Sequence, residues 1–286
     1  MYKPISPILH LLLLIIFIGA FGSSAYYIKA DSIVPPAATL PSEPVLSTPI
    51  IFEPISEPGW TLLQPGLEKR VFEIYDNQNQ HVESLHIWRL DQRYFRLDVA
   101  YEAIPKTLAR WQEEMNALLV MNGGYYSIDN ESYFPDGLTI VNGAARGRSF
   151  GGSAGMLAIH DGGAEIRWLA QRPYQPSEPL RAALQSFPVL VEPGGRLGFG
   201  PERESHASAR RTVIAQDRSG RILFIIAPQG YFNLHQLSVY LTESELDLDS
   251  ALNLDGGGST GILVADPQEV IPPTRPLPFV ILVYPR

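Results

Sequence analysis

The sequence predicts an α+β domain with a mixed, largely antiparallel sheet and a few packed helices. Most apolar residues occur in short runs that alternate with polar residues, as in strands with one buried face. Several of these runs are separated by a few turn-forming residues, as in hairpins, whose strands are antiparallel. Helical spacing of apolar residues is confined to a small part of the chain. With 286 residues, of which 45% are hydrophobic, the chain is long enough to bury a substantial core.

An N-terminal hydrophobic segment precedes this domain. Pro4–Ile28 contains no Lys, Arg, Asp or Glu, and Lys3 gives the chain a weakly positive start. Residues 1–30 are therefore interpreted as a signal peptide or a signal-anchor helix. Small residues at 23–25 and 28–30 would permit cleavage, whereas the uncharged stretch also reaches the roughly 20 residues that span a bilayer. We expect export, with the protein either secreted after cleavage or held at the membrane by this segment with its domain outside the cytoplasm.

Residues 31–58 form a second region, which is rich in Pro, Ser, Thr and Glu. Proline has no N–H for a sheet ladder and favours extended chain. We interpret this region as a Pro-rich linker. The folded domain is then expected at residues 59–286, beginning near Trp60.

The strand predictions rest on alternation and on turn residues. Alternating apolar and polar residues favour half-buried strands, and short apolar runs bounded by glycine favour buried ones. Asp161–Gly163 and Asp217–Gly220 each separate two such runs, so both pairs are predicted as hairpins. The predicted strands are His81–Leu90, Tyr94–Tyr101, Ala117–Met121, Met156–His160, Glu165–Leu169, Thr212–Gln216, Arg221–Ala227, Ala251–Leu254, Gly261–Ala265 and Phe279–Tyr284.

The predicted helices begin with recognisable signals. Pro105–Asn116 is predicted as a helix because its apolar residues recur at helical spacing and its proline suits a first turn. A second helix is predicted from Asn233, a candidate N-cap with Gln236 three residues on, to the neighbourhood of Ser244. Its leucines form the face that we expect to be buried.

Charge and cysteine content exclude several functional classes. The formal net charge is −8 and no run of Lys and Arg exceeds two residues, so no nucleic-acid partner is expected. The absence of cysteine excludes disulfides, thiolate catalysis and cysteine-based zinc sites. No dedicated cluster of metal ligands is recognised, so we predict no metal site and no required cofactor. The alternative that Asp255 binds a divalent cation stays open.

The segment around Asp255 is the most informative for chemistry. Glycines let the backbone approach a ligand closely, and successive exposed N–H groups make an anion-binding concavity. A carboxylate beside such a concavity can act as a base, a nucleophile or a metal ligand. The same composition also fits a glycine-rich turn that Asp255 caps. Asp255 ends an apolar run and is followed by Gly256, Gly257, Gly258, Ser259 and Thr260.

The sequence of Ala251–Ser259 resembles the signature of the phosphodiester glycosidase family. Other segments are similar to motifs of that family and stand in the family's order. They are Met121–Tyr126, Pro135–Leu138, Asn142-Gly143, Leu184–Val191, Arg211-Thr212 and Arg275-Pro276. The resemblance covers residues 117–286. The sequence departs from the family's pattern at 213–216 and at 227–232, which bears on the substrate more than on the reaction type.

The resemblance implies hydrolysis of a sugar 1-phosphodiester in an envelope or extracellular glycoconjugate, with release of the sugar. A phosphorylated sugar or glycan would then be the partner. Asp255 would act on the sugar side as base or nucleophile, Arg211 would pair with the phosphate, and Asp136 would be the second carboxylate. The expected substrate-binding residues are Asn122, Gly123, Gln185, Thr212, Gly256, Gly257, Gly258 and Ser259.

Alternatives stay open for the residues and for the function. Asn122 also fits a local turn, Arg211 a surface position on a strand edge, and the Gln185 amide a partner within the backbone. The alternative functions are a non-catalytic envelope module that binds phosphorylated glycans, and a phosphodiesterase of a different substrate class. The sequence does not separate cleavage of the C–O bond from cleavage of the P–O bond.

Overall fold

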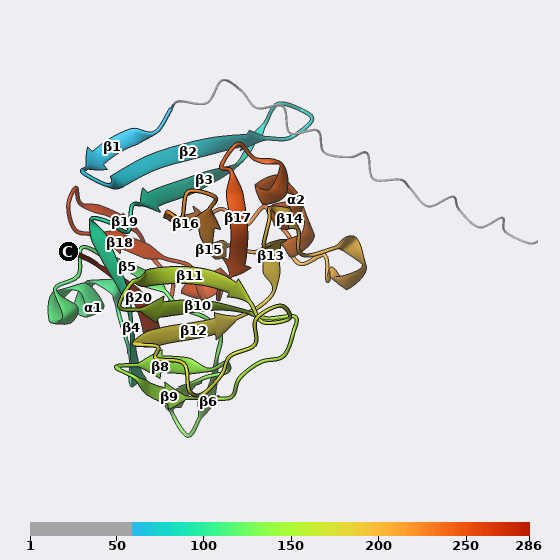
Figure 1. Ribbon diagram of the computed structural model, residues 1–286. Coiled ribbons are helices and arrows are strands. Elements are labelled where there is room, and N and C mark those ends of the chain that lie inside the picture. Colours follow the sequence, from blue (N-terminus) through green and yellow to red (C-terminus); the bar gives the residue numbers. More distant parts are fainter. Residues whose placement is uncertain (1–58) are drawn as a thin grey trace, which may run out of the picture. The chain divides into compact units, whose positions relative to one another are not determined.

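Residues 59–286 are described by a computed structural model (Figure 1). The signal or anchor predicted at 1–30 and the linker predicted at 31–58 lie outside the described residues. The first described strand begins at Thr61, next to the predicted domain start. No helix among residues 59–286 has the length and apolar character needed to cross a membrane.

The described strands form three sheets and one separate hairpin. The largest sheet has eight strands. In spatial order they are β1 (Thr61–Gln64), β2 (Leu67–Tyr75), β3 (His81–Leu90), β16 (Ile222–Ala227), β15 (Arg211–Asp217), β17 (Leu248–Asn253), β13 (Val189–Glu192) and β14 (Arg196–Leu197).

The other two sheets have five strands each. One runs in the order β11 (Gly163–Trp168), β10 (Gly155–His160), β12 (Ala182–Ser186), β8 (Thr139–Val141) and β9 (Ala144–Arg146). The other runs in the order β19 (Glu269–Ile271), β18 (Ile262–Val264), β5 (Leu119–Asn122), β20 (Leu277–Pro285) and β4 (Phe95–Lys106). The separate hairpin consists of β6 (Tyr126–Asp129) and β7 (Ser132–Pro135).

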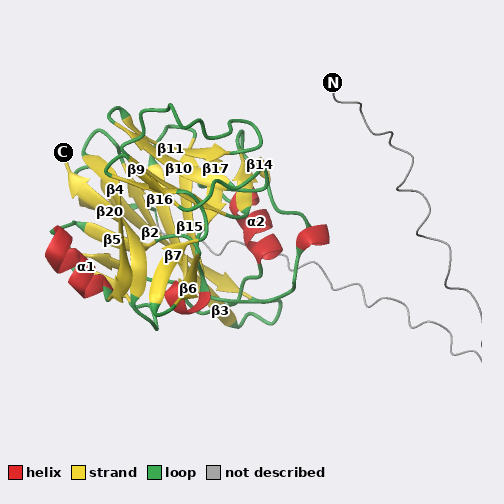
Figure 2. Cartoon of the chain, turned by 90° about the horizontal axis from the view of Figure 1, so that it is seen from below, coloured by secondary structure: helices red, strands yellow, loops and turns green. Residues whose placement is uncertain are grey.

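One hydrophobic core is shared by the three sheets. Trp88 and Phe224 reach it from the eight-stranded sheet, Leu157 from β10, and Met121 and Ile281 from β5 and β20; all are fully buried. Because side chains alternate between the faces of a strand, each sheet has a second face to cover. The helix α2 (Leu234–Glu243) packs on the eight-stranded sheet, and α1 (Leu108–Met115) packs on the sheet that contains β5. Figure 2 shows the two helices on opposite sides of the strands.

Both predicted helices are present. The capping box of α2 is confirmed: the Asn233 side chain accepts the Gln236 N–H at 2.8 Å, and Gln236 accepts the Asn233 N–H at 3.0 Å. The start of α1 differs from the prediction, because Pro105 belongs to β4 and Thr107 is the N-cap. A strand at the edge of its sheet tolerates proline, so Pro105 lies near the end of β4 instead of opening the helix.

The predicted α+β class and the largely antiparallel arrangement are confirmed. Each predicted strand is found, with some shifts at its ends. The prediction of a mixed sheet was wrong, because every strand pair of residues 59–286 is antiparallel. The run Leu184–Val191, which resembles one motif of the family, is divided between β12 and β13 in different sheets. Pro188 has no N–H for a ladder and stands at that division.

Candidate active site

The candidate site lies where β5 and β17 end and β15 begins. In the antiparallel pair of β15 and β17, Val213 lies opposite Asn253. The Leu254 N–H donates to the Thr212 carbonyl at 2.9 Å, so Arg211 and Asp255, two residues beyond the last ladder pair, come to the same end of this strand pair. The Asp255 N–H donates to the carbonyl of Gly123 at 3.2 Å, which joins the end of β5 to the same place. Segments far apart in the sequence, each with a predicted site residue, therefore converge.

The Asn122 side chain is 1% exposed and is used within the protein. Its Oδ1 accepts hydrogen bonds from Thr212 Oγ1 at 2.8 Å and from the Gly261 N–H at 3.1 Å. Its Nδ2 donates to the carbonyls of Gly123 at 3.1 Å and Asp255 at 2.8 Å. A side-chain amide has two donor hydrogens and two acceptor positions, so all of its capacity is taken. The geometry gives Asn122 a positioning role beneath Asp255, instead of the substrate contact expected from the sequence.

The Asp255 carboxyl is partly buried, and this burial raises its pKa above the ordinary value. A hydrogen bond from Ser259, a second from the Gly256 N–H at 2.9 Å and the positive charge of Arg275 act in the opposite direction. The negative charge of Asp136 adds to the increase, so the two carboxylates predicted for the site interact electrostatically. A carboxyl group with a raised pKa is suited to proton transfer near neutral pH.

Residues 256–259, which we call the glycine loop, use most of their N–H groups internally. Besides the bond to Asp255, the Gly257 N–H donates to the Arg210 carbonyl at 2.8 Å, and the Ser259 N–H donates to the Gly256 carbonyl at 3.1 Å. Within the described part of the chain, the Gly258 N–H makes no hydrogen bond. The predicted anion cradle is therefore reduced to one free N–H. Gly257 has a φ of +58°, a conformation that glycine adopts at no steric cost.

The Arg211 side chain is 9% exposed and is fixed by two carbonyls. Its Nε donates to Phe232 at 3.1 Å and its Nη2 donates to Ala207 at 2.6 Å. Burial lowers the pKa of this arginine, and interactions with Tyr125 and Glu204 oppose that change. Its Nη1 makes no hydrogen bond to any residue that the structure describes. Arg211 is thus a preorganised cation with donor capacity left for an anion.

Aromatic side chains lie next to these charged groups. The hydroxyl of Tyr125 accepts a hydrogen bond from Asn253 Nδ2 at 2.8 Å. Burial and the charge of Asp255 raise the Tyr125 pKa, whereas the charge of Arg211 lowers it. The Tyr125 ring lies 4.6 Å from the ring of Phe187, centre to centre, and Phe187 is 41% exposed. Phe187 therefore offers an open aromatic surface beside Tyr125.

The other predicted substrate-binding residues are packed inside the domain. The Gln185 amide accepts the Phe150 N–H at 2.7 Å and donates to Ser149 Oγ at 3.0 Å, so it holds that loop. Thr212 is fully buried, and its hydroxyl donates to Asn122. A side chain at Gly123 would clash with the Phe279 ring. These three positions shape the site without facing a ligand.

Glu83 is a site-supporting residue that the sequence analysis missed. Its fully buried carboxylate accepts the N–H groups of residues 229, 230 and 231 at 3.0, 3.0 and 3.2 Å. These residues form the turn at which the sequence departs from the family's pattern. A signal was present, because strict alternation in β3 puts Glu83 on the same face as Leu85 and Ile87. A glutamate at an inward position needs buried hydrogen-bond donors.

Arg275 is the second missed residue. A Cβ atom added to Gly258 would lie 2.5 Å from Arg275 Nε, so the guanidinium rests against the glycine loop. Its charge lowers the pKa of Asp255. Arg275 is exposed, and its guanidinium has no hydrogen bond or ion pair within residues 59–286. The sequence showed only an arginine between Thr274 and Pro276, with no sign of this contact.

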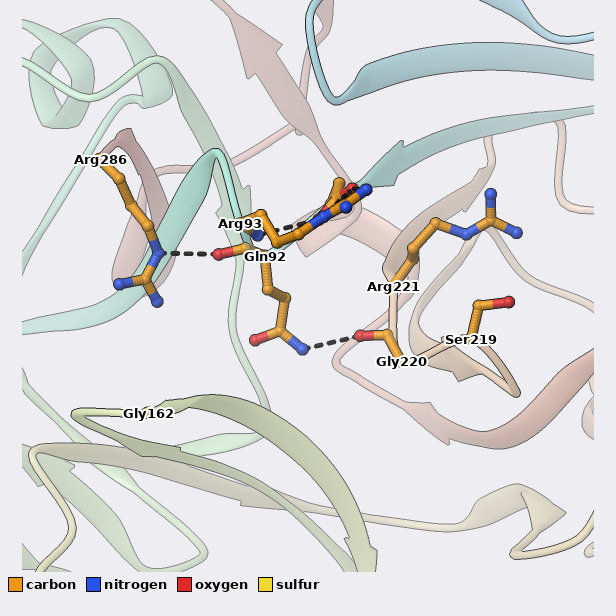
Figure 3. A pocket seen from close by; sticks show the side chains of 8 residues that line it. Gln92, Arg93, Gly162, Ser219, Gly220, Arg221 and Arg286 are labelled. Carbon is orange, nitrogen blue, oxygen red and sulfur yellow. Dashed lines mark hydrogen bonds and ion pairs between the residues drawn. The ribbon is translucent and has the colours of Figure 1, made fainter.

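A separate cavity of about 680 Å³ lies at the opposite end of β15 and β16 (Figure 3). Arg93 in its wall is paired with Asp91, and Arg221 is paired with the buried Asp217. Arg286 donates to the Gln92 carbonyl at 2.7 Å. Most of the positive charge that lines this cavity is therefore engaged within the protein, and none of the predicted site residues lies there. Among residues 59–286, no group of three or more His, Cys, Asp or Glu side chains is arranged to hold a metal ion.

The fold and the site together describe one kind of protein. It is an antiparallel β domain that brings a partly buried aspartate (Asp255), a second carboxylate (Asp136) and a fixed arginine (Arg211) together where strands converge. The sequence profile of the phosphodiester glycosidases matches residues 115–284, which is more than half of the chain. The chain belongs to the phosphodiester glycosidase family, as the resemblance implied. A comparison with curated protein sequences gives no match.

Several solved structures are similar in fold, among them the following three. The catalytic domain of zebrafish N-acetylglucosamine-1-phosphodiester alpha-N-acetylglucosaminidase, auto-inhibited by its pro-peptide, has a TM-score of 0.63 at 18% identity, over 78% of this chain and 85% of that one. A hypothetical protein from Synechocystis has a TM-score of 0.53 at 13% identity, over 81% and 64%. A putative exported protein from Burkholderia pseudomallei has a TM-score of 0.51 at 14% identity, over 71% and 74%.

Proposed function

We propose that this protein hydrolyses a sugar 1-phosphodiester of an envelope or extracellular glycoconjugate and releases the sugar. The observation that carries the proposal is that Arg211 and Asp255 adjoin the hydrogen bond from the Leu254 N–H to the Thr212 carbonyl at 2.9 Å, and that the charges of both act on Tyr125. Asp136 is near enough to raise the Asp255 pKa. Membership of the phosphodiester glycosidase family supports the hydrolase class.

In the proposed reaction, water attacks C1 of the sugar and the bond between C1 and the bridging oxygen breaks. The electron pair of that bond leaves with the phosphate, so the products are the free sugar and a phosphate monoester of the alcohol. A phosphate monoester is a better leaving group than an alcohol. Stabilising negative charge therefore matters more than protonating the leaving oxygen. We assign this role to Arg211 and to the Gly258 N–H.

Asp255 acts on the sugar side in this proposal. Its carboxylate takes the proton of the attacking water, for which the raised pKa is favourable. Asp136 is the second carboxylate that glycoside hydrolysis commonly uses, and its Oδ1 accepts a hydrogen bond from Ser127. The exposed ring of Phe187 is the surface against which the sugar would stack. Asn122 holds the Asp255 carbonyl and so positions the glycine loop.

Export and cofactor use remain part of the proposal. Alkaline phosphatase fused after Pro58 should be active if residues 1–58 direct export, and an inactive reporter in full-length fusion protein would argue against export. We propose that no cofactor is required. Dialysis against EDTA tests the alternative of a divalent cation on Asp255, because turnover would then be lost and would return with added metal.

The proposal is tested by turnover of a panel of sugar 1-phosphodiesters that differ in the sugar. We expect at least one member to release its sugar, with Asp255→Asn as the inactive control. Binding of the panel without turnover would instead support a phosphoglycan-binding module. Turnover restricted to lipid or nucleotide diesters would support a phosphodiesterase of another class.

A further inference from the structure

A mainly apolar groove of about 440 Å³ lies beside the glycine loop, between the start of α1 and residues 268–276. Val270 and Leu263 are paired across β19 and β18, so their side chains share one face of the sheet. Val270 is 44% exposed, which is high for valine in a strand. The apolar residues that line the groove include Leu108, Leu263, Val270, Pro272, Pro273 and Pro276.

The wall of the groove contacts the glycine loop of the candidate active site. Arg275 lines the groove and also rests against Gly258, next to Asp255. Thr274, another lining residue, donates its N–H to the Gly258 carbonyl at 2.9 Å. Arg210 adds a second link, because its Nη2 donates to the Pro272 carbonyl at 3.0 Å while its own carbonyl accepts the Gly257 N–H. The groove wall is therefore fixed directly to the glycine loop.

The charge of Arg275 and the apolar lining indicate which ligand the groove would bind. A phosphodiester carries one negative charge, and Arg275 presents a cation with no partner in the described part of the chain at the boundary between loop and groove. A phosphate held there would send its alcohol substituent along the Val270 face. The hydroxyls of a polyol would lose hydrogen bonds to water against proline, leucine and valine, whereas a hydrocarbon chain would gain by leaving water.

We propose that Arg275 and this groove form the subsite for the leaving half of the substrate, which is a phosphate monoester of an alcohol with an apolar chain. The inference rests on the proposed hydrolysis of a sugar 1-phosphodiester and names the class of its alcohol. Arg275 contacts the phosphate, and Val270 contributes to the choice of alcohol. The substrate class is thus a sugar linked through phosphate to an apolar alcohol.

The test is calorimetric titration of the protein with hexyl phosphate and with glycerol 3-phosphate. Each methylene that leaves water contributes about fourfold in affinity, so two buried methylenes already give more than about tenfold. We expect the unmodified protein to prefer hexyl phosphate by at least about tenfold. Val270→Asp should reduce this preference to near one. Because both ligands carry a phosphate, a general electrostatic effect of the new carboxylate largely cancels in the ratio.

Leu197→Asp is the matched control, because Leu197 is 43% exposed and lies on β14, at the far edge of the eight-stranded sheet. It should keep the preference. Arg275→Gln should weaken both ligands and leave their ratio largely unchanged. Thermal unfolding of each variant confirms that it is folded.

Equal affinity for the two phosphates, or a preference that survives in Val270→Asp, would overturn the proposal. Self-association of the unmodified protein that Val270→Asp abolishes, with no preference between the ligands, would assign the groove to a second copy and also overturn it. Both ligands resemble the product, so the titration gives an answer even if no sugar 1-phosphodiester is cleaved. A clear preference without turnover would count against the proposed hydrolysis and not against the subsite.

Discussion

Replacing Asn122 with alanine should destabilise the domain, because its amide is the common partner of four groups. The Gly123 carbonyl keeps the Asp255 N–H as a partner after the change, whereas three groups lose theirs: the Thr212 hydroxyl, the Gly261 N–H and the Asp255 carbonyl. A buried polar group without a partner costs about 1–3 kcal/mol. The expected loss in the free energy of unfolding is therefore about 3 kcal/mol or more.

Urea unfolding of Asn122→Ala and of the unmodified protein measures this loss. Asn77→Ala is the control, because Asn77 is exposed in the turn between β2 and β3, and we expect a change within about 0.5 kcal/mol. A substrate contact by Asn122 would give another result: unchanged stability with a higher KM. A loss below about 1 kcal/mol in Asn122→Ala would refute the positioning role.

Three further predictions concern the charged groups and the bond that breaks. Because burial raises the folded pKa of Asp255, the stability linked to its proton is present below the unfolded value of about 3.9 and is lost as pH rises through the folded pKa. Asp255→Asn should therefore melt above the unmodified protein at pH 7, by a margin that shrinks on acidification; a lower melting temperature at pH 7 would favour a turn-capping role. Arg211→Lys should reduce kcat/KM by about 100-fold or more, since a point charge cannot replace a fixed guanidinium, and wild-type kinetics would remove Arg211 from the site. Hydrolysis in ¹⁸O-water should label the sugar and not the phosphate, and label in the phosphate would mean that the P–O bond is cleaved.

Local signals in the sequence were sufficient for most secondary structure. The capping box of α2 and the hairpins of β10–β11 and β15–β16 depend on contacts between residues that are close together in the sequence. Local residue patterns therefore predict them. The division of Leu184–Val191 between two sheets depends on which distant strands are available for pairing. Apolar runs look alike whichever sheet they join, so this division was not predictable.

The candidate site was only partly predictable for the same reason. Asp255 and Arg211 could be predicted as site residues from their residue types and from the motifs in which they stand. Asn122 has an equally informative residue type, but its role depends on Thr212 and Gly261, which approach it from other strands. Arg275 could not be predicted as a site residue, because nothing in its sequence neighbourhood indicates a role. Only its contact with Gly258 in the folded domain places it at the site.

The most direct test of the account is Asp255→Asn, assayed for turnover and for binding on a sugar 1-phosphodiester that the unmodified protein cleaves. Asparagine keeps the size of the side chain and removes its charge and basicity. We predict a loss of turnover of at least about 100-fold, the scale of a removed general base, with the variant folded. Binding should persist or tighten, because a carboxylate repels a nearby phosphate by about 1 kcal/mol. Full turnover in folded Asp255→Asn would contradict the mechanism.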